Sequence, residues 1–270
     1  MTSYKEYFKT ILEGGDLDDK LLVTDFTWDD WSEYEIPSYP TRIEKLKFSK
    51  DQMKFPKKES LHLDEKKALA LHSFANHELL AIEMMAAAIL HYPHKTEEDI
   101  KIKKGIFSSL KDEQKHFKLY VNRLNDLGFE FGDFPLNDFF WRQMHNLKTP
   151  AQYFSVMALT FEAANLDFAQ YYRDVFAGFG DEKTAKILNV VLEDEISHVA
   201  LGSFWLKKWR EDKSLWQYYL DSLPWPLTPA RSKGIGFDPL IHERAMGDND
   251  FIQSLIQFED PFRVTKRKSP

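Results

Sequence analysis

The sequence predicts an all-α protein: a four-helix bundle with a long crossover, carrying helical or extended flanking segments at both ends. Only 11 Gly and 12 Pro interrupt 270 residues, which favours long helices over many short strands. The residues between the second and third helices are numerous enough to run along the length of a bundle. Apolar residues recur at helical spacing in four long stretches, 63–91, 96–127, 150–178 and 181–210.

The first 60 residues are expected to form a separate wrapping segment, residues 1–60. Short helices are predicted near 4–12 and 17–22. Three prolines, at positions 37, 40 and 56, then prevent any long helix before the bundle begins.

The four long helices define a bundle domain at 61–211, and its helices carry recognisable start and stop signals. Thr96, followed by three acidic residues, fits a helix start, and Pro150 fits a first helical turn. Gly128 and Gly178 fit helix ends. The crossover is expected to contain a short helix at 137–145.

The C-terminal residues 212–270 are predicted to be a belt or lid on the bundle. Two short helices, at 239–246 and 248–257, are expected within it. Prolines at 224, 226 and 229 favour an extended path before them.

The composition excludes several classes of function. There is no cysteine, which rules out disulfides, thiolate nucleophiles and thiolate metal ligands. The net charge of −7 argues against a nucleic-acid partner, whose binding surface is usually basic. Because no signal peptide and no apolar run of membrane length occurs, we expect a cytoplasmic protein without a membrane partner.

A short acidic motif occurs twice, each time on a predicted long helix. Asp112-Glu113 is followed by His116, and Asp194-Glu195 is followed by His198. Random placement would give roughly 0.06 copies of Asp-Glu-x-x-His in such a chain, so chance explains two copies poorly. A third Glu-x-x-His, at 59–62, lacks the Asp and lies in a Pro/Lys-rich segment, as a random copy would.

Each motif follows a helix with a matching pair of carboxylates. "HELLAIE" (77–83) aligns with "FEAANLD" (161–167), which pairs Glu78 with Glu162 and Glu83 with Asp167. The chain therefore contains an internal two-fold repeat. Neighbouring positions at helical spacing favour Glu78 and Glu162 as the inward residues. Glu83 remains the rival on the first helix, since its neighbours are also mostly apolar.

The inward carboxylates predict a metal site. Buried carboxylates are costly unless they are protonated or bound to cations, and two divalent ions would offset four of them. Glu and His suit iron, manganese or zinc, and the lack of soft ligands disfavours copper. The predicted ligands are Glu78, Glu113, His116, Glu162, Glu195 and His198. Packing or surface roles are the plainer interpretation of other polar and aromatic residues: His72, His77, His145, Tyr120 and Tyr172.

This ligand pattern resembles the ferritin-like di-iron carboxylate superfamily. Over most of the chain, "HELLAIE", "DEQKHF", "FEAANLDFA", "DEISHV" and "LPWPLTPARSKGIGF" are similar to a bacterial family catalogued as domain of unknown function 455. The resemblance implies a ferritin-like bundle holding two iron ions, or one manganese and one iron. Relatives in the superfamily include ferroxidases, peroxide-reducing rubrerythrins, ribonucleotide reductase small subunits and hydroxylases.

Among these activities, the missing cysteine and the long flanks favour an oxidase or oxygenase that uses dioxygen and a small organic substrate. Iron handling, peroxide reduction and a metal-stabilised interaction scaffold remain the alternatives, and a homodimer remains open. The substrate is expected to reach the metals through a channel closed by the 128–146 loop and the 215–240 belt. Arg231 and Lys233 are candidates for holding an anionic group there.

Asp112 and Asp194 are predicted to support the ligands. Each precedes a metal-binding Glu and is turned about 100° from it, towards a neighbouring helix. Metal-bound histidines usually donate their second N–H to a carboxylate. We therefore expect crossed pairs, Asp112 with His198 and Asp194 with His116.

Overall fold

The computed structural model describes residues 2–29, 31–51 and 53–260, and the chain is mostly helical over this part. It divides into two compact units, Met1–His145 and Asn146–Pro270. Each unit contains two of the four predicted long helices. The bundle domain expected over 61–211 contains helices of both units, so it stays a prediction.

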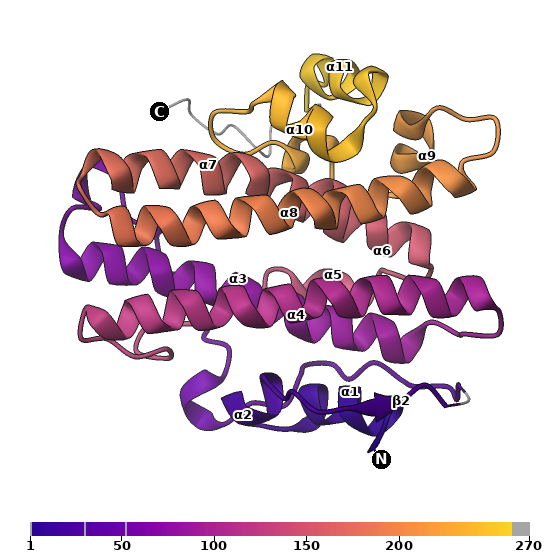
Figure 1. Ribbon diagram of the computed structural model, residues 1–270, viewed down its shortest axis with the longest axis horizontal. Helices are drawn as coiled ribbons and strands as arrows, with labels where there is room; N and C mark the ends of the chain where they lie inside the picture. The colour runs from indigo at the N-terminus through magenta and orange to yellow at the C-terminus, as the bar shows by residue number, and fades with distance from the viewer. Residues whose placement is uncertain (1, 30, 52, 261–270) are drawn as a thin grey trace. The chain divides into compact units, whose positions relative to one another are not determined.

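The first unit is built on a pair of long helices, α3 (Asp64–His91) and α4 (Glu97–Asp126), which pack side by side (Figure 1). Their bounds confirm the predicted stretches. Thr96 caps α4: its side chain accepts from the Asp99 N–H while the Asp99 carboxylate accepts from the Thr96 N–H. Such a cap contributes about 1 kcal/mol to a helix.

The N-terminal segment packs on this pair through aromatic rings. It contains two helices, α1 (Tyr4–Glu13) and α2 (Leu17–Lys20). It also contains two short strands that the sequence did not predict, β1 (Thr2–Ser3) and β2 (Phe26–Thr27), which pair in parallel. Phe8 and Phe26 contact Phe107 of α4, with ring centres 5.5 and 5.1 Å away. Two 3₁₀ turns follow, η1 (Glu44–Leu46) and η2 (Lys58–Ser60).

Several interactions hold the loop after α4 against the rest of the first unit. The Gly132 N–H donates to Nε2 of His72 at 3.0 Å, and the His72 ring stacks on Phe131. The expected short helix is present as α5 (Trp141–Met144), shorter than predicted. Trp141 donates its indole N–H to the Ser38 carbonyl, which ties α5 to the N-terminal segment.

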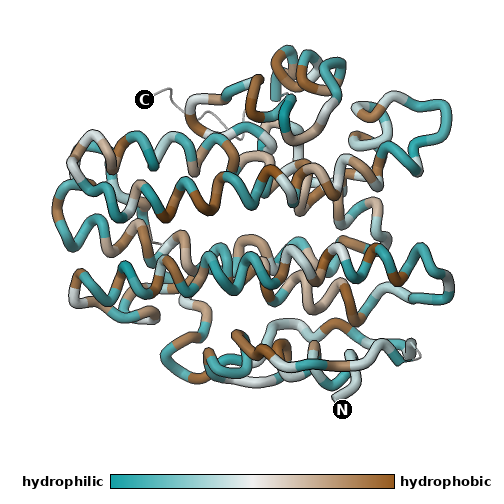
Figure 2. Tube along the Cα trace, in the orientation of Figure 1, coloured by the Kyte–Doolittle hydropathy of each residue, from teal (hydrophilic) through white to brown (hydrophobic). Residues whose placement is uncertain are grey.

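The second unit contains the other long pair, α7 (Ala163–Gly178) and α8 (Glu182–Trp209), which also lie side by side (Figure 1). Hydrophobic and hydrophilic residues alternate along α8 (Figure 2), as expected of a helix with one face packed and one face exposed. The prediction of one regular α-helix at 150–178 is wrong in its middle. There, α6 (Pro150–Val156) continues into a π-helical segment, η3 (Met157–Glu162), before α7 begins.

In the described part of the C-terminal belt, two helices and a 3₁₀ turn pack on α7 and α8, and a third helix packs on these elements. The two expected helices are confirmed as α10 (Pro239–Met246) and α11 (Asn249–Gln257). The sequence did not predict α9 (Leu215–Ser222), and η4 (Pro229–Ser232) follows it. Within the described ranges, every helix falls short of the length and apolarity that crossing a membrane requires.

Candidate metal centre

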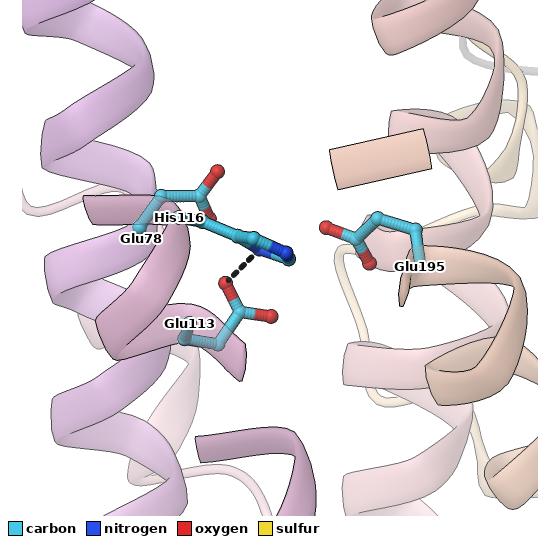
Figure 3. Close-up of side chains that lie close together, drawn as sticks. All are labelled: Glu78, Glu113, His116 and Glu195. Atoms are coloured by element: carbon cyan, nitrogen blue, oxygen red, sulfur yellow. Dashed lines mark ion pairs between the residues drawn. The ribbon is translucent and has the colours of Figure 1, made fainter. Parts of the chain in front are cut away.

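Three predicted ligands come together in the first unit. Glu78 lies on α3, and Glu113 and His116 lie one turn apart on α4 (Figure 3). One ligand atom from each residue lies within 4.8 Å of the others. Nδ1 of His116 is 3.5 Å from Oε2 of Glu113, and all three side chains are buried. We call these residues the first trio.

The second unit brings together the three equivalent residues, Glu162, Glu195 and His198. Their ligand atoms also lie within 4.8 Å of one another. Nδ1 of His198 is 3.4 Å from Oε2 of Glu195, which repeats the arrangement of the first trio. Each Glu-x-x-His therefore directs a carboxylate and the Nδ1 atom of an imidazole towards one place. We call these residues the second trio.

The π-helical segment ends at Glu162 and so sets the direction of this ligand. A π turn holds one residue more than an α turn, which rotates the side chains that follow it. The Thr160 hydroxyl donates to the Ser155 carbonyl, five residues earlier, at 2.7 Å. Ala158 of this segment packs against Gly202 of α8, where an added Cβ would lie 2.2 Å from the Ala158 Cβ. Such π segments are frequent at functional sites.

Asn165 holds one carboxylate of the second trio in place. Its side-chain Nδ2 donates to Oε1 of Glu195 at 2.7 Å. The other oxygen, Oε2, is buried and accepts no hydrogen bond from the described residues. A buried carboxylate oxygen without a donor is costly, and it fits a position where a cation would bind.

Asn165 was not predicted from the sequence as part of the site. In the internal repeat its equivalent is Ala81, which has no polar group to support Glu113. The only sequence feature that could have indicated its role is its position, three residues after Glu162 on a helix predicted to carry a metal ligand.

The donor set of both trios suits a transition metal. Each offers two carboxylates and one imidazole, and oxygen and nitrogen donors of this kind bind iron, manganese or zinc. All six side chains are buried, with exposed fractions of 8% or less. The residues present therefore fit the metal that the pattern predicts.

Glu83, the rival ligand, is bound by two cations. Its carboxylate accepts from Nε and Nη2 of Arg42 at 3.1 and 2.6 Å, and Nζ of Lys20 lies 3.1 Å from Oε1. Lys20 also donates to the Ile11 carbonyl, and the Arg42 guanidinium lies over the Phe48 ring. This Glu83 cluster joins the N-terminal segment to α3 and occupies both carboxylate oxygens.

Asp167, the equivalent residue in the second unit, is also fully engaged. Its two oxygens accept from the backbone N–H groups of Gly234 and Asp238 at 2.7 and 3.0 Å. Nε2 of the buried His242 lies 3.1 Å from Oδ2. Gly234 is required here, since an added Cβ would lie 2.6 Å from the Cβ of Asp167. This Asp167 cluster joins the belt to α7.

The other histidines singled out from the sequence have packing or surface roles. Burial lowers the pKa of His72 and of His77 to about 4, so both rings are neutral near pH 7. His77 stacks on Phe140, and His145 is an exposed residue near the Ser38 carbonyl.

The two tyrosines lie in aromatic contacts. Tyr120 packs against Phe74, and Tyr172 packs against Phe168 and Tyr171. Lys233, a candidate for anion binding, donates to the carbonyls of Leu255 and Phe258. Its ammonium group therefore caps the end of α11.

Asp112 and Asp194 are half-buried, as side chains turned sideways from the ligands would be. Nζ of Lys115 lies 3.4 Å from Oδ1 of Asp112. The expected crossed pairs each join a residue of one unit to a residue of the other, so they stay predictions.

The chain was compared with known proteins. The model of the family described as "Protein of unknown function (DUF455)" matches residues 13–238. The chain belongs to this family. That match contains both trios, the residues Lys20, Arg42 and Glu83 of the Glu83 cluster, and the Asp167 cluster except His242. An "Uncharacterized protein" of Haemophilus influenzae is 28% identical over 155 residues, which cover 55% of this chain and 53% of the relative. The chain thus matches about half the length of that relative, and no solved structure gives a significant match.

Proposed function

We propose that this DUF455 protein holds two transition-metal ions, two iron ions or one manganese and one iron. We propose further that it uses them to activate dioxygen for the oxidation of a small organic molecule. The observation that carries the proposal is the pair of buried trios, one in each unit, with the same residue types at the same helical spacing. In this proposal the two trios join in one ferritin-like four-helix bundle.

Charge balance supports two divalent ions. Four buried carboxylates carry four negative charges, which two such ions would offset, and Glu113 and Glu195 would hold them together with Glu78, Glu162 and the two histidines. Bound metals would supply a place for dioxygen and a store of oxidising equivalents.

The surrounding residues position the ligands and exclude other candidates. Asn165 orients Glu195. Glu83 and Asp167 are withdrawn from metal binding by their own partners. Asp112 and Asp194 are proposed to hold the distal N–H of the histidines, which would fix the tautomer that presents Nδ1 to the metal.

Metal analysis of ligand variants tests the proposal. Protein purified without chelator is expected to contain about two transition-metal ions per chain, and Glu78→Ala or Glu162→Ala is expected to lose most of this metal. The double variant Glu59→Ala/His62→Ala is a matched control, because it removes the third Glu-x-x-His, which lies outside both trios. Well under one metal ion per wild-type chain, or equal loss in the control, would contradict the proposal.

Oxygen addition to the ferrous protein then separates the possible activities. One stoichiometric oxidation supports an oxidase or oxygenase, whereas accumulation of ferric mineral supports iron storage. Rapid consumption of peroxide in place of dioxygen supports a peroxide reductase, and an inert metal site supports a scaffold.

A further inference from the structure

A basic pocket lies on the surface of the first unit where α3 begins. Its volume is about 420 Å³, and its lining combines Lys54, Lys57 and Lys66 with the apolar residues Pro56, Leu63 and Leu69. Glu59 and His62 complete the charged or titratable lining. Leu63 is 49% exposed and Phe55 beside the pocket is 39% exposed. We call Lys54, Phe55, Lys57, Leu63 and Lys66 the basic patch.

The charge of the patch is opposite to that of the protein. The chain carries a net charge of −7, yet three lysines and one carboxylate line this pocket. Lys66 also lies 3.4 Å from the carboxylate of Glu65, so the charge is mixed with a positive excess. Exposed apolar side chains beside such an excess are typical of a protein-binding surface, and the excess charge steers a partner of opposite sign. The patch therefore fits an acidic protein surface.

A chain of aromatic contacts leads from the patch towards the first trio. The ring of Phe55 lies 5.6 Å from the ring of Phe74 on α3, and Phe74 lies 5.5 Å from Tyr120 on α4. Phe74 is one helical turn before Glu78, and Tyr120 is one turn after His116. Leu69, at the pocket, precedes Glu78 by nine residues, which is about 14 Å along an α-helix.

We propose that the basic patch docks a small acidic one-electron carrier protein, which delivers electrons to the metal centre. This inference rests on the proposed function, because an iron centre that activates dioxygen must be reduced again. In each step one reduced carrier gives up one electron and one ferric ion becomes ferrous, so two carriers restore a di-iron centre. The electron would pass from the carrier to the metal through the packed rings of Phe55, Phe74 and Tyr120.

Direct binding to a plant-type [2Fe–2S] ferredoxin tests the docking surface without requiring activity. We expect metal-free and metal-loaded protein to bind this carrier alike, more weakly at higher salt. The charge-reversed variant Lys54→Glu/Lys57→Glu/Lys66→Glu is expected to bind at least tenfold more weakly. The matched control, Lys101→Glu/Lys104→Glu/Lys186→Glu, changes the same number of exposed lysines on α4 and α8 and is expected to bind within twofold of wild type.

Stopped-flow oxidation of the reduced ferredoxin tests the path. Phe74→Leu is expected to slow electron transfer to the metal-loaded protein severalfold while leaving the dissociation constant unchanged. Equal rates in this variant would overturn the aromatic path.

Two further outcomes would overturn the docking proposal while leaving the proposed function intact. One is a metal-loaded protein that does not bind ferredoxin. The other is a patch that binds a single-stranded RNA oligonucleotide in preference to ferredoxin. Conversely, salt-sensitive ferredoxin binding by protein that was purified without chelator and contains no metal would support the surface, while the missing metal would contradict the proposed function.

Discussion

Glu83 and Asp167 occupy equivalent positions in the internal repeat, five residues after Glu78 and Glu162, yet different chemistry surrounds them. Two buried cations, Lys20 and Arg42, bind Glu83, whereas Asp167 receives two backbone N–H groups and lies beside a histidine. In both units the carboxylate fastens a flanking segment to its long helix. The comparison shows that in each repeat one carboxylate lies in a buried trio, while the carboxylate five residues later is held by a flanking segment.

The same contrast extends to neighbouring groups. On the N-terminal side, the buried Lys103 of α4 lies 3.1 Å from Nδ1 of His94 and over the Tyr4 ring. On the C-terminal side, the buried Tyr219 hydroxyl bonds with the hydroxyls of Thr160 and Ser232. Around Glu83 the polar contacts of the first flank come from ammonium and guanidinium groups, whereas around Asp167 and Tyr219 those of the second come from neutral donors. Elsewhere Lys207 and Arg244 add cationic contacts between α8 and α10.

Removing the charge of Glu83 should have the largest effect on stability. Glu83→Gln leaves Lys20 and Arg42 buried without a counter-ion, and breaking a buried ion cluster in this way costs about 3–5 kcal/mol. Urea unfolding followed by circular dichroism measures the loss. The apolar replacement Lys20→Met/Arg42→Met/Glu83→Leu is expected to restore most of it, since it leaves no unpaired charge. If Glu83→Gln is as stable as wild type, the cluster does not fasten the flank.

Asp167→Asn should have a smaller effect. The amide retains one acceptor oxygen, so the expected cost is about 1.5–3 kcal/mol, the range for hydrogen bonds to a charged group. Hydrogen exchange should become faster in α10 and around residues 234–238, with little change in α1. A loss equal to that of Glu83→Gln would show that the cationic and the neutral arrangement do not differ in strength.

The smallest of the three expected effects is a dependence of the free energy of unfolding on pH that arises on the N-terminal flank only. Burial lowers the pKa of Lys103 to about 7, opposed by Asp99, whereas in the unfolded chain this lysine keeps its proton up to about pH 10.5. The unfolded state then binds more protons between these values, so stability rises with pH across this window. From pH 7 to 8 the expected gain is about 1 kcal/mol.

The C-terminal flank should not share this slope. Burial raises the pKa of Tyr219 to about 12, so its hydroxyl is neutral in both folded and unfolded states across pH 7–8. Urea unfolding at the two pH values measures the gain, and Lys103→Met should reduce it by about 1 kcal/mol. An undiminished gain in that variant would assign the slope to other groups.

The sequence predicted the long helices and the grouping of each Glu-x-x-His pair because both depend on local spacing. Helix periodicity and caps such as Thr96 act within a few residues, and Glu-x-x-His places both groups on one face of a helix. The choice between Glu78 and Glu83 was different. Both have apolar neighbours, and the choice depends on cations 41 and 63 residues away, a pairing that no local pattern specifies.

Other features were missed for similar reasons. The π segment before Glu162 contains no Pro or Gly, and its packing against Gly202 depends on another helix. In the sequence Asn165 is one polar residue on a helix, and its hydrogen bond to Glu195 joins it to a different helix. The sequence did not predict α9, which ends just before three prolines, although Leu215 and Tyr219 are buried at helical spacing.

During synthesis, the partners of Glu83 and those of Asp167 are made in opposite orders: the partners of Glu83 precede it in the chain, and those of Asp167 follow it. Lys20 and Arg42 leave the ribosome before Glu83, so the N-terminal flank must wait, with its cations hydrated, for α3 to be synthesised. At about 5–20 residues per second the 41 residues after Arg42 take a few seconds. Asp167, in contrast, is made before Gly234 and Asp238, so α7 waits for the belt. The N-terminal flank is therefore made first and packs on α3 after α3 is synthesised, whereas the C-terminal belt is made last and packs on α7, which is already formed.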